Sequence, residues 1–320
     1  MKIAIIGASG LVGRNVLKQL LRFSSKHEIL LYTSKNSAGK IIENYKCEEL
    51  SDKTIQKVDV AIFSAGGSVS KEWAEKFTNL GAFVVDNSNA FRREKSVPLV
   101  VPEINASTIN KTTKIIANPN CSTIQIALPL YYLNKQTKIE RVIISTYQSV
   151  SGAGQKGVLD LENDTSNKFP YKIKNNLIPQ IDIPLENGYT LEEDKMNFEL
   201  KKILNEPNIM VTATAVRVPV KNCHGASVYV EFENKMDIKT AKEILSNATG
   251  IVVQDDLNNS IYPMPINSIE SPMVYVGRLR QDLNNPNAIC FWCVSDNLYK
   301  GASTNALQIM EIVEKFTIKN

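Results

Sequence analysis

The sequence predicts an α/β protein of two domains, a doubly wound parallel sheet followed by an α+β domain with a mixed, largely antiparallel sheet. Three observations predict this class. Short β-rich runs alternate with helical stretches over residues 1–120, long strand-like runs follow one another after residue 121, and a glycine-rich turn joins the first strand to the first helix. The chain has 320 residues, of which 43% are hydrophobic, so it can fill two cores.

The first region alternates strands and helices. In chain order its segments are KIAIIG (2–7), LVGRNVLKQLLRF (11–23), HEILLYT (27–33), KVDVAIFSA (57–65), SKEWAEKFTNLG (70–81), AFVVDNS (82–88), LVVPEIN (99–105) and TKIIANP (113–119). Because helices that alternate with strands connect parallel neighbours, this order favours a parallel, doubly wound sheet.

The pattern changes after residue 121. A helix is expected at STIQIALPLYYLNK (122–135), and strands at 139–150, 208–220, 226–233, 273–282 and 287–296. Residues 169–194 are rich in Pro and Asn and predict an irregular excursion, and residues 300–320 predict an amphipathic helix. Several long strands in succession indicate the second, α+β domain.

The composition excludes several classes of protein. The formal net charge is +4, but Lys and Arg are interspersed with Asp and Glu, which argues against nucleic-acid or membrane partners and leaves a small anionic ligand open. No apolar run approaches the roughly 20 residues that span a bilayer. At the N-terminus, MKIAIIGASGLVG resembles a signal peptide, but only IAII precedes the glycines, so a strand entering a tight turn fits better.

The cysteines predict a reducing compartment, the cytoplasm. There are five, Cys47, Cys121, Cys223, Cys290 and Cys293. Five cysteines are too few for a disulfide framework, and an odd number cannot all pair within one chain. CFWC (290–293) lies inside a strand-like run, where positions three apart point to opposite faces, so its two sulfurs are not expected to bond.

The motif GASGLVG (7–13) follows the first strand and opens the first helix. Glycines in this position allow the backbone to approach a pyrophosphate, and the helix N-terminus supplies free N–H groups, which predicts a Rossmann-type dinucleotide site. The spacing is G-x-x-G-x-x-G rather than G-x-G-x-x-G, and a turn that merely needs glycine is the alternative.

The end of the second strand favours NADP over NAD. NAD enzymes usually carry Asp or Glu there for the ribose hydroxyls, whereas this chain continues with Thr33, Ser34, Lys35, Asn36 and Ser37, then Lys40. Hydroxyl, amide and cationic groups suit a 2′-phosphate. A polar loop that serves only solubility is the alternative.

Cys121 is a candidate nucleophile, with a buried structural cysteine as the alternative. It follows the strand-like run KIIANPN, and Pro119 disfavours helix before it while Ser122 and Thr123 suit a first turn. A thiol at a helix N-terminus has its pKa lowered by the macrodipole, which enriches the reactive thiolate.

The whole pattern resembles the aspartate-semialdehyde dehydrogenase family nearly end to end. The resemblance is carried by GASGLVG, NSAGK (36–40), FSAGGSVSKEW (63–73), VVDNSNAFR (84–92), LVVPEIN, NPNCSTIQ (118–125), QSVSGAGQKG (148–157), RVPVKNCHGASV (217–228) and WCVSDNLYKGASTNALQI (292–309). It implies that aspartyl phosphate is reduced to aspartate semialdehyde with NADPH, a step toward lysine (through diaminopimelate), threonine, methionine and isoleucine. Thiolate attack, loss of phosphate to leave a thioester, and hydride delivery fit that chemistry.

The resemblance also implies the site residues. Cys121 is the nucleophile and His224 the acid/base group, and no metal is implied. Backbone N–H groups at the start of the Cys121 helix, with Asn120, are expected to receive the oxyanion. Substrate contacts are implied for Arg217 (carboxylate), Arg92 and Lys202 (phosphate), Glu199 (amino group) and Gln148 (acyl group); cofactor contacts are implied for Gly7, Ser9, Gly10, Leu11, Val12, Gly13, Ser34, Asn36, Ser37, Ser151, Gly152 and Asn297, the last at the nicotinamide end.

Two positions depart from the family pattern. Relatives often carry Arg where this chain has Asn36, which weakens the charge argument for NADP, although Lys35 can substitute. Cys223 often corresponds to Gly or another small residue, and it is a candidate second modifiable thiol beside His224.

Two other functions are weighed against this one. A reductase of N-acetylglutamyl phosphate shares the fold, thiol and histidine, but its substrate lacks the free ammonium that Glu199 is expected to meet. A non-catalytic NADP-binding regulator need not keep thiol, base and anion-binding groups together. The family further implies a homodimer or homotetramer built on the second domain's sheet, and a nucleotide domain of residues 1–120 plus the helix 300–320, with residues 121–299 as the catalytic and dimerisation domain.

Overall fold

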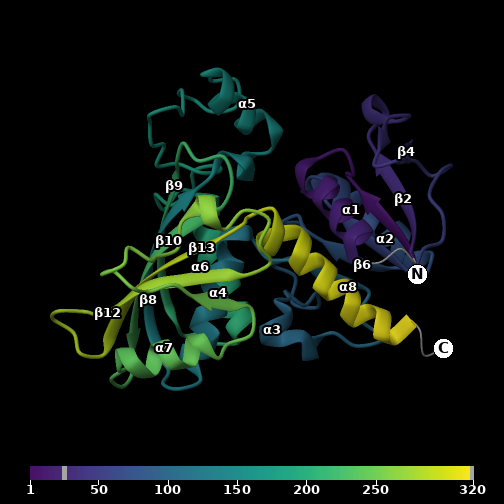
Figure 1. The fold of residues 1–320 in the computed structure, drawn as a ribbon. Coiled ribbons are helices and arrows are strands. Elements are labelled where there is room, and N and C mark those ends of the chain that lie inside the picture. Colours follow the sequence, from purple (N-terminus) through teal and green to yellow (C-terminus); the bar gives the residue numbers. More distant parts are fainter. Residues whose placement is uncertain (24–26, 318–320) are drawn as a thin grey trace. The chain divides into compact units, whose positions relative to one another are not determined.

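A computed structural model describes residues 1–23 and 27–317, and Figure 1 shows its ribbon. The chain divides into two compact units. The first contains Met1–Pro119 and the chain from Ala302 onward, and the second contains Asn120–Gly301. Both are α/β in composition, which confirms the predicted fold class.

The first unit is built on a seven-stranded sheet with the order β3-β4-β2-β1-β5-β6-β7. Every neighbouring pair is parallel except β3 and β4. The strands are β1 (Lys2–Ile6), β2 (Glu28–Thr33), β3 (Ile41–Ile42), β4 (Tyr45–Glu49), β5 (Val60–Phe63), β6 (Phe83–Asp86) and β7 (Ile115–Ala117). The predicted parallel, doubly wound sheet is therefore confirmed.

Helices pack on both faces of this sheet. On one face, α1 (Leu11–Phe23) and α8 (Thr304–Thr317) lie side by side in Figure 1, and Leu17 and Met310 share one apolar cluster with Ile3. On the other face, Phe77 of α2 (Gly67–Asn79) meets the rings of Tyr32 and Phe63 edge-on. The amphipathic C-terminal helix thus completes the core of the first unit.

The second unit is built on a six-stranded sheet with the order β11-β12-β13-β10-β8-β9. Its strands are β8 (Ile139–Gln148), β9 (Met210–Arg217), β10 (His224–Phe232), β11 (Ile251–Val253), β12 (Val274–Gln281) and β13 (Ala288–Ser295). The pairs β8–β9 and β11–β12 are parallel and the other neighbours antiparallel, which confirms the expected mixed sheet.

Three helices cover one face of the second sheet: α4 (Cys121–Asn134), α6 (Leu191–Leu204) and α7 (Ile238–Ser246). The helix α4 is apolar on all sides and almost wholly buried, as a central helix must be. On β8, side chains alternate, so that Ile144 is buried while Ile143 and Tyr147 stay 44% and 41% exposed. The loop that carries Pro263 covers the part of this second face near Trp292, whereas the part around Ile143 and Tyr147 is exposed and forms the uncovered face of the sheet.

Some elements were not expected from the sequence. LVVPEIN contributes only an isolated bridge at Leu99 and then a short helix, α3 (Pro102–Asn105), because Pro102 is well suited to the first helical turn. The short elements β3, β4, β11, α5 (Gln155–Asn163) and α7 were also not foreseen. Residues 318–320 of the predicted C-terminal helix lie outside the described residues.

The cysteines agree with the expectation for a reduced protein. All five are free. On β13, Cys293 is buried whereas Cys290 is half-buried, in keeping with opposite faces of one strand, so the prediction that CFWC does not form a disulfide is confirmed. Separately, none of the helices in the described ranges is long and apolar enough to cross a membrane.

Candidate active site

The glycine-rich turn of the first unit runs from β1 into α1. Gly7 has φ +82°, and a side-chain carbon there would lie 2.8 Å from the backbone of Ser64, so only glycine fits. Gly10 is different, because it is exposed and a side-chain carbon would meet nothing nearer than an oxygen at 3.4 Å. Packing therefore does not require glycine at position 10, and the bare backbone there could admit the close approach of a ligand.

The predicted ribose loop follows β2 as a single 3₁₀ turn, Lys35–Ser37. Ser34, Lys35 and Asn36 are exposed, and Lys40 Nζ donates to Ser37 Oγ at 3.4 Å. The loop thus presents hydroxyl, amide and ammonium groups to solvent without a carboxylate.

In the second unit, Cys121 is the first residue of α4, as predicted. Asn120 is the N-cap: its Oδ1 accepts from the backbone N–H of Ser122 at 2.9 Å and of Thr123 at 3.4 Å. The backbone N–H of Asn120 donates to Glu199 Oε2 at 2.7 Å. The thiol is half-buried. The geometry therefore places it at a capped helix N-terminus.

The hydrogen bonds of the Asn120 side chain use N–H donors that were expected to stabilise the oxyanion. The N–H groups of Ser122 and Thr123 already have the Asn120 side chain as acceptor, and the Asn120 amide nitrogen donates to Glu192. Other donors must therefore contribute to an oxyanion site.

A π-helical turn, Tyr299–Ser303, packs against the nucleophile. A methyl group at Gly301 would lie 2.9 Å from Cβ of Cys121 and 3.3 Å from its Cα. π-Helical turns of this kind are frequent at functional sites. Only glycine at position 301 leaves Cys121 where α4 places it.

We expect Gly301→Ala to lower the rate at which iodoacetamide alkylates Cys121 by about tenfold, because the added methyl group crowds the thiol and displaces it. The rate is measured by mass spectrometry of the peptide that contains Cys121. Circular dichroism provides the control that the variant is folded. An unchanged alkylation rate would show that the turn does not constrain the thiol.

His224 begins β10 and is fully buried. Its Nδ1 accepts from the backbone N–H of Ser149 at 3.0 Å, with Ser149 Oγ also 3.0 Å away. Because a backbone N–H can only donate, the neutral ring carries its proton on Nε2, and that atom has no partner among the described residues. Burial and the charge of Arg217 hold the His224 pKa well below its usual value.

Arg217 ends β9 and is 5% exposed. Its Nη1 donates to the Ser149 carbonyl at 2.6 Å, and no carboxylate of the described residues forms an ion pair with it. Burial lowers the Arg217 pKa, while the negative charges of Glu192 and Cys121 act in the opposite direction. A buried guanidinium without a carboxylate partner is suited to an anionic ligand.

Gly152 and Asn297 lie beside these two side chains. A side-chain carbon at Gly152 would lie 2.9 Å from Arg217 Nη1 and 3.1 Å from His224 Nε2. Asn297 Oδ1 accepts from Ser149 Oγ at 3.0 Å, and Asn297 Nδ2 donates to Ser151 Oγ at 3.0 Å. Asn297 therefore supports Ser149, the residue on which His224 depends.

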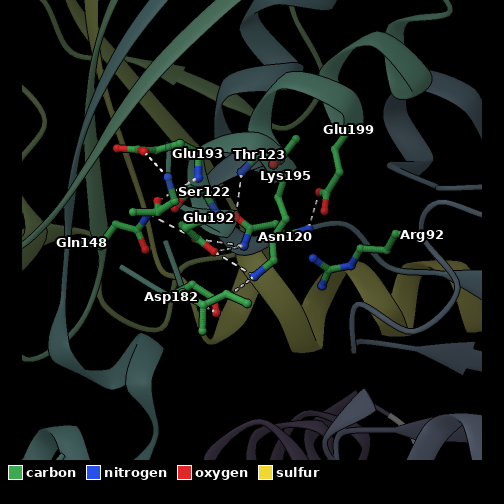
Figure 2. Close-up of polar contacts among 12 residues, drawn as sticks. Arg92, Asn120, Ser122, Thr123, Gln148, Asp182, Glu192, Glu193, Lys195 and Glu199 are labelled. Atoms are coloured by element: carbon green, nitrogen blue, oxygen red, sulfur yellow. Dashed lines mark hydrogen bonds and ion pairs between the residues drawn. The ribbon is translucent and has the colours of Figure 1, made fainter. Parts of the chain in front are cut away.

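Sequence reasoning missed Glu192, a buried carboxylate in the first turn of α6. Figure 2 shows its carboxylate with the Gln148 amide on one side and the Asn120 amide and Lys195 ammonium on the other. The pattern TLEE did contain a signal, because Thr190 and Glu193 form a capping box that fixes where α6 begins. Nothing in the local pattern indicates that Glu192 meets Asn120 and Gln148.

The remaining predicted substrate residues are divided between the units. Glu199 and the half-buried Lys202 lie one turn apart on α6 in the second unit. Arg92 lies in the first unit, where its Nη2 donates to the Asn87 carbonyl at 2.8 Å. The structure brings Asn120, Cys121, Gln148, Ser151, Gly152, Glu199, Lys202, Arg217, His224 and Asn297 into one unit, and the glycine-rich turn and Arg92 into the other.

Cys223 is not suited to be a second reactive thiol. It is fully buried, and burial together with the Asp296 carboxylate raises its pKa. Its φ of +69° is the left-handed conformation that favours glycine, which gives a physical reason for small residues at this position.

Comparison with known proteins identifies the family. Residues 2–112 match the family described as "Semialdehyde dehydrogenase, NAD binding domain", and residues 129–300 match "Semialdehyde dehydrogenase, dimerisation domain". An aspartate-semialdehyde dehydrogenase of Aquifex aeolicus is 45% identical, with 98% of each chain covered. One of Bacillus subtilis is 40% identical, with 99% of each covered.

Solved structures support the same family assignment. The crystal structure of aspartate semialdehyde dehydrogenase II complexed with ASA from Vibrio cholerae has a TM-score of 0.92 and 38% identity, with 98% of each chain covered. The structure of the Candida albicans enzyme with NADP has a TM-score of 0.77 and 25% identity, also with 98% of each covered. The resemblance drawn from the motifs is confirmed, and the chain belongs to the aspartate-semialdehyde dehydrogenase family.

Proposed function

We propose that this chain is an NADP-dependent, phosphorylating aspartate-semialdehyde dehydrogenase, which reversibly reduces L-4-aspartyl phosphate to L-aspartate 4-semialdehyde. The observation that carries the proposal is the thiol of Cys121 at a capped helix N-terminus, in the same unit as an Arg217 guanidinium without a carboxylate partner and an unpartnered His224 Nε2. The names of the relatives support the same activity.

Cys121 is the proposed nucleophile. The positive end of the α4 dipole and the charge of Arg217 favour its thiolate. The sulfur attacks the acyl carbon of aspartyl phosphate, the C–O bond to phosphate breaks, and a thioester remains on Cys121. In the reverse direction the thiolate adds to the aldehyde, and the hemithioacetal would pass a hydride to the oxidised cofactor to leave a thioester. Inorganic phosphate then attacks the thioester carbon, and the Cys121 thiolate leaves.

His224 is proposed to act through Nε2. Each tetrahedral intermediate carries an oxyanion, and the neutral ring has its N–H on this nitrogen. The resemblance implies an acid/base group, and of these two roles the tautomer set by Ser149 favours proton donation toward the oxyanion. Arg217 is proposed to bind the substrate carboxylate, and Arg92 and Lys202 its phosphate.

The residues of the first unit fit a dinucleotide. Bare backbone at Gly10 suits a pyrophosphate, and Ser34, Asn36 and Ser37 suit the ribose end, with Ser9, Leu11, Val12 and Gly13 flanking. When bound, the cofactor supplies the hydride. The absence of a carboxylate after β2, with Lys35 beside Asn36, supports NADP over NAD.

We further propose that two copies associate through the uncovered face of the second sheet, giving a homodimer or a homotetramer. The exposed Ile143 and Tyr147 support this, because monomers rarely leave apolar side chains gathered on one sheet face. The match to a dimerisation domain over residues 129–300 supports association through the second unit.

The test is reduction of NADP by aspartate semialdehyde in the presence and absence of inorganic phosphate. We expect turnover that requires phosphate, slower turnover with NAD, and none with N-acetylglutamate semialdehyde. Turnover with the N-acetyl substrate alone would instead identify the other reductase. Nucleotide binding without turnover of either aldehyde would indicate a regulator.

A further inference from the structure

The carboxylate of Glu192 sits at the centre of a buried polar cluster. The residue is 5% exposed, and its oxygens accept from Asn120 Nδ2 at 3.0 and 3.1 Å, from Gln148 Nε2 at 3.2 Å and from Lys195 Nζ at 3.2 Å. An ionised carboxylate only accepts hydrogen bonds, so every neighbour must turn an N–H group toward it. Glu192 thereby dictates the orientation of two amides.

Lys195 links this carboxylate to a second one, that of Asp182. Lys195 Nζ also pairs with Asp182 at 2.6 Å, and although burial alone lowers the Lys195 pKa, Glu192 and Asp182 raise it overall. The cluster therefore contains one ammonium and two carboxylates. An ammonium group only donates hydrogen bonds, so Lys195 adds a third donor group around the Glu192 carboxylate.

The first consequence concerns the nucleophile. The amide of Asn120 has one donor end and one acceptor end, and Glu192 takes the donor end. Its oxygen must then face the helix, where it caps α4 through Ser122 and Thr123. An amide turned the other way would place an NH₂ group against those N–H groups, next to Cys121.

The second consequence concerns the substrate. Gln148 Nε2 donates to both Glu192 and Thr146 Oγ1, so the amide oxygen faces away from them. Within the ranges that the structure describes, Gln148 Oε1 accepts no hydrogen bond. Aspartyl phosphate carries permanent N–H donors only on its ammonium group, so an acceptor at Gln148 suits that end of the molecule rather than the acyl group that the resemblance implies.

We propose that Glu192 is a positioning residue for the reaction. It fixes the amide of Asn120 so that α4 is capped ahead of Cys121, and it fixes the amide of Gln148 so that an acceptor oxygen meets the substrate. This inference rests on the proposed function. Glu192 acts through these two amides and does not itself react.

Glu193 is the matched control. It is the next residue of the same helical turn and is 8% exposed. Its carboxylate accepts from the backbone N–H of Thr190 at 2.7 Å and of Ala215 at 2.9 Å, and from no site residue. Glu192→Gln and Glu193→Gln both set an NH₂ group against donors, but only the first disturbs Asn120 and Gln148.

We expect Glu192→Gln to lower kcat/KM for aspartate semialdehyde by about 10²-fold, and Glu193→Gln to stay within about threefold of wild type, because misplacement of a catalytic geometry by about 1 Å costs that much. Both variants are expected to lower the unfolding temperature. Wild-type kcat/KM in Glu192→Gln, or an equal loss in Glu193→Gln, would overturn the proposal.

Exchanging the Glu192 carboxylate and the Gln148 amide adds the unfolding temperature as a second readout. Gln148→Glu alone sets two carboxylates against each other and is expected to lower the unfolding temperature strongly. Combined with Glu192→Gln, the amide at position 192 can donate to the carboxylate at position 148, with no change in net charge. We expect the double variant to have a higher unfolding temperature than Gln148→Glu, close to that of wild type. We also expect its kcat/KM to be about tenfold higher than that of Glu192→Gln.

The unfolding temperature and kcat/KM together distinguish a failure of the proposed function from a failure of the proposed role of Glu192. The unfolding temperature does not depend on the reaction, so an inactive wild type would overturn the proposed function while the exchange still tests the contact. Lack of recovery in the unfolding temperature would overturn the orienting role of Glu192. Recovery of the unfolding temperature without recovery of kcat/KM would show that its role is structural only.

Discussion

Cys121→Ala is expected to abolish phosphate-dependent reduction of NADP, with a loss on the order of 10⁴-fold or more. The reason is that no thioester can form without the sulfur. The substitution keeps the Cβ atom that packs against Gly301, so the fold should be undisturbed. Activity is measured spectrophotometrically with aspartate semialdehyde and phosphate, and integrity by the unfolding temperature.

Cys223→Ala is the control for this loss. Its thiol is fully buried and has a raised pKa, so it should not contribute to turnover or to alkylation. Full activity in Cys121→Ala would refute the thioester mechanism. Equal losses in the two variants would indicate damage to the fold around His224 rather than removal of a nucleophile.

His224→Asn is expected to lower kcat by about 10²- to 10⁴-fold, the usual contribution of a positioned proton donor or acceptor. An asparagine oxygen can replace Nδ1 as acceptor for the Ser149 N–H, so the local structure should persist while Nε2 is lost. His224→Gln, whose amide reaches the place of Nε2, should retain more activity than His224→Asn. Higher activity in His224→Asn than in His224→Gln would show that Nδ1, rather than Nε2, is the nitrogen that matters for turnover.

The same residue makes stability depend on pH. In the unfolded chain His224 binds a proton near its ordinary pKa of 6.5, whereas in the folded protein burial and Arg217 keep it neutral to much lower pH. The unfolded state therefore binds more protons below pH 6.5, and the free energy of unfolding falls as pH decreases through this range. Urea titrations at several pH values should show a smaller decrease in His224→Asn.

Much of the fold could be predicted because its signals are local. The run LVGRNVLKQLLRF coincides with α1, and the strand predicted at 139–150 contains β8. Both depend on periodicity and on turn residues, which act over a few positions. The placement of Cys121 at the start of α4 followed from Pro119 and the polar residues around it for the same reason.

The part that could not be predicted depends on residues that are distant in the sequence. Glu192 meets Asn120 and Gln148 across separations of 72 and 44 residues, and Gly301 meets Cys121 from the far end of the second unit. No periodicity reports such contacts. The tautomer of His224 was equally inaccessible, because it depends on which backbone N–H faces the ring.

The helix α8 makes the core of the first unit depend on a segment that is synthesised roughly 300 residues after its first strand. Leu307, Met310 and Val313 fill the same apolar cluster as Ile3 and Val16, which leave the ribosome roughly 300 residues earlier. During translation, this face of the sheet is therefore covered only in part, by α1, until α8 is made. Apolar surface that is exposed in this interval favours aggregation. We expect this core to close only after α8 has left the ribosome, and the unit to depend on chaperones more than one whose core is contiguous in sequence.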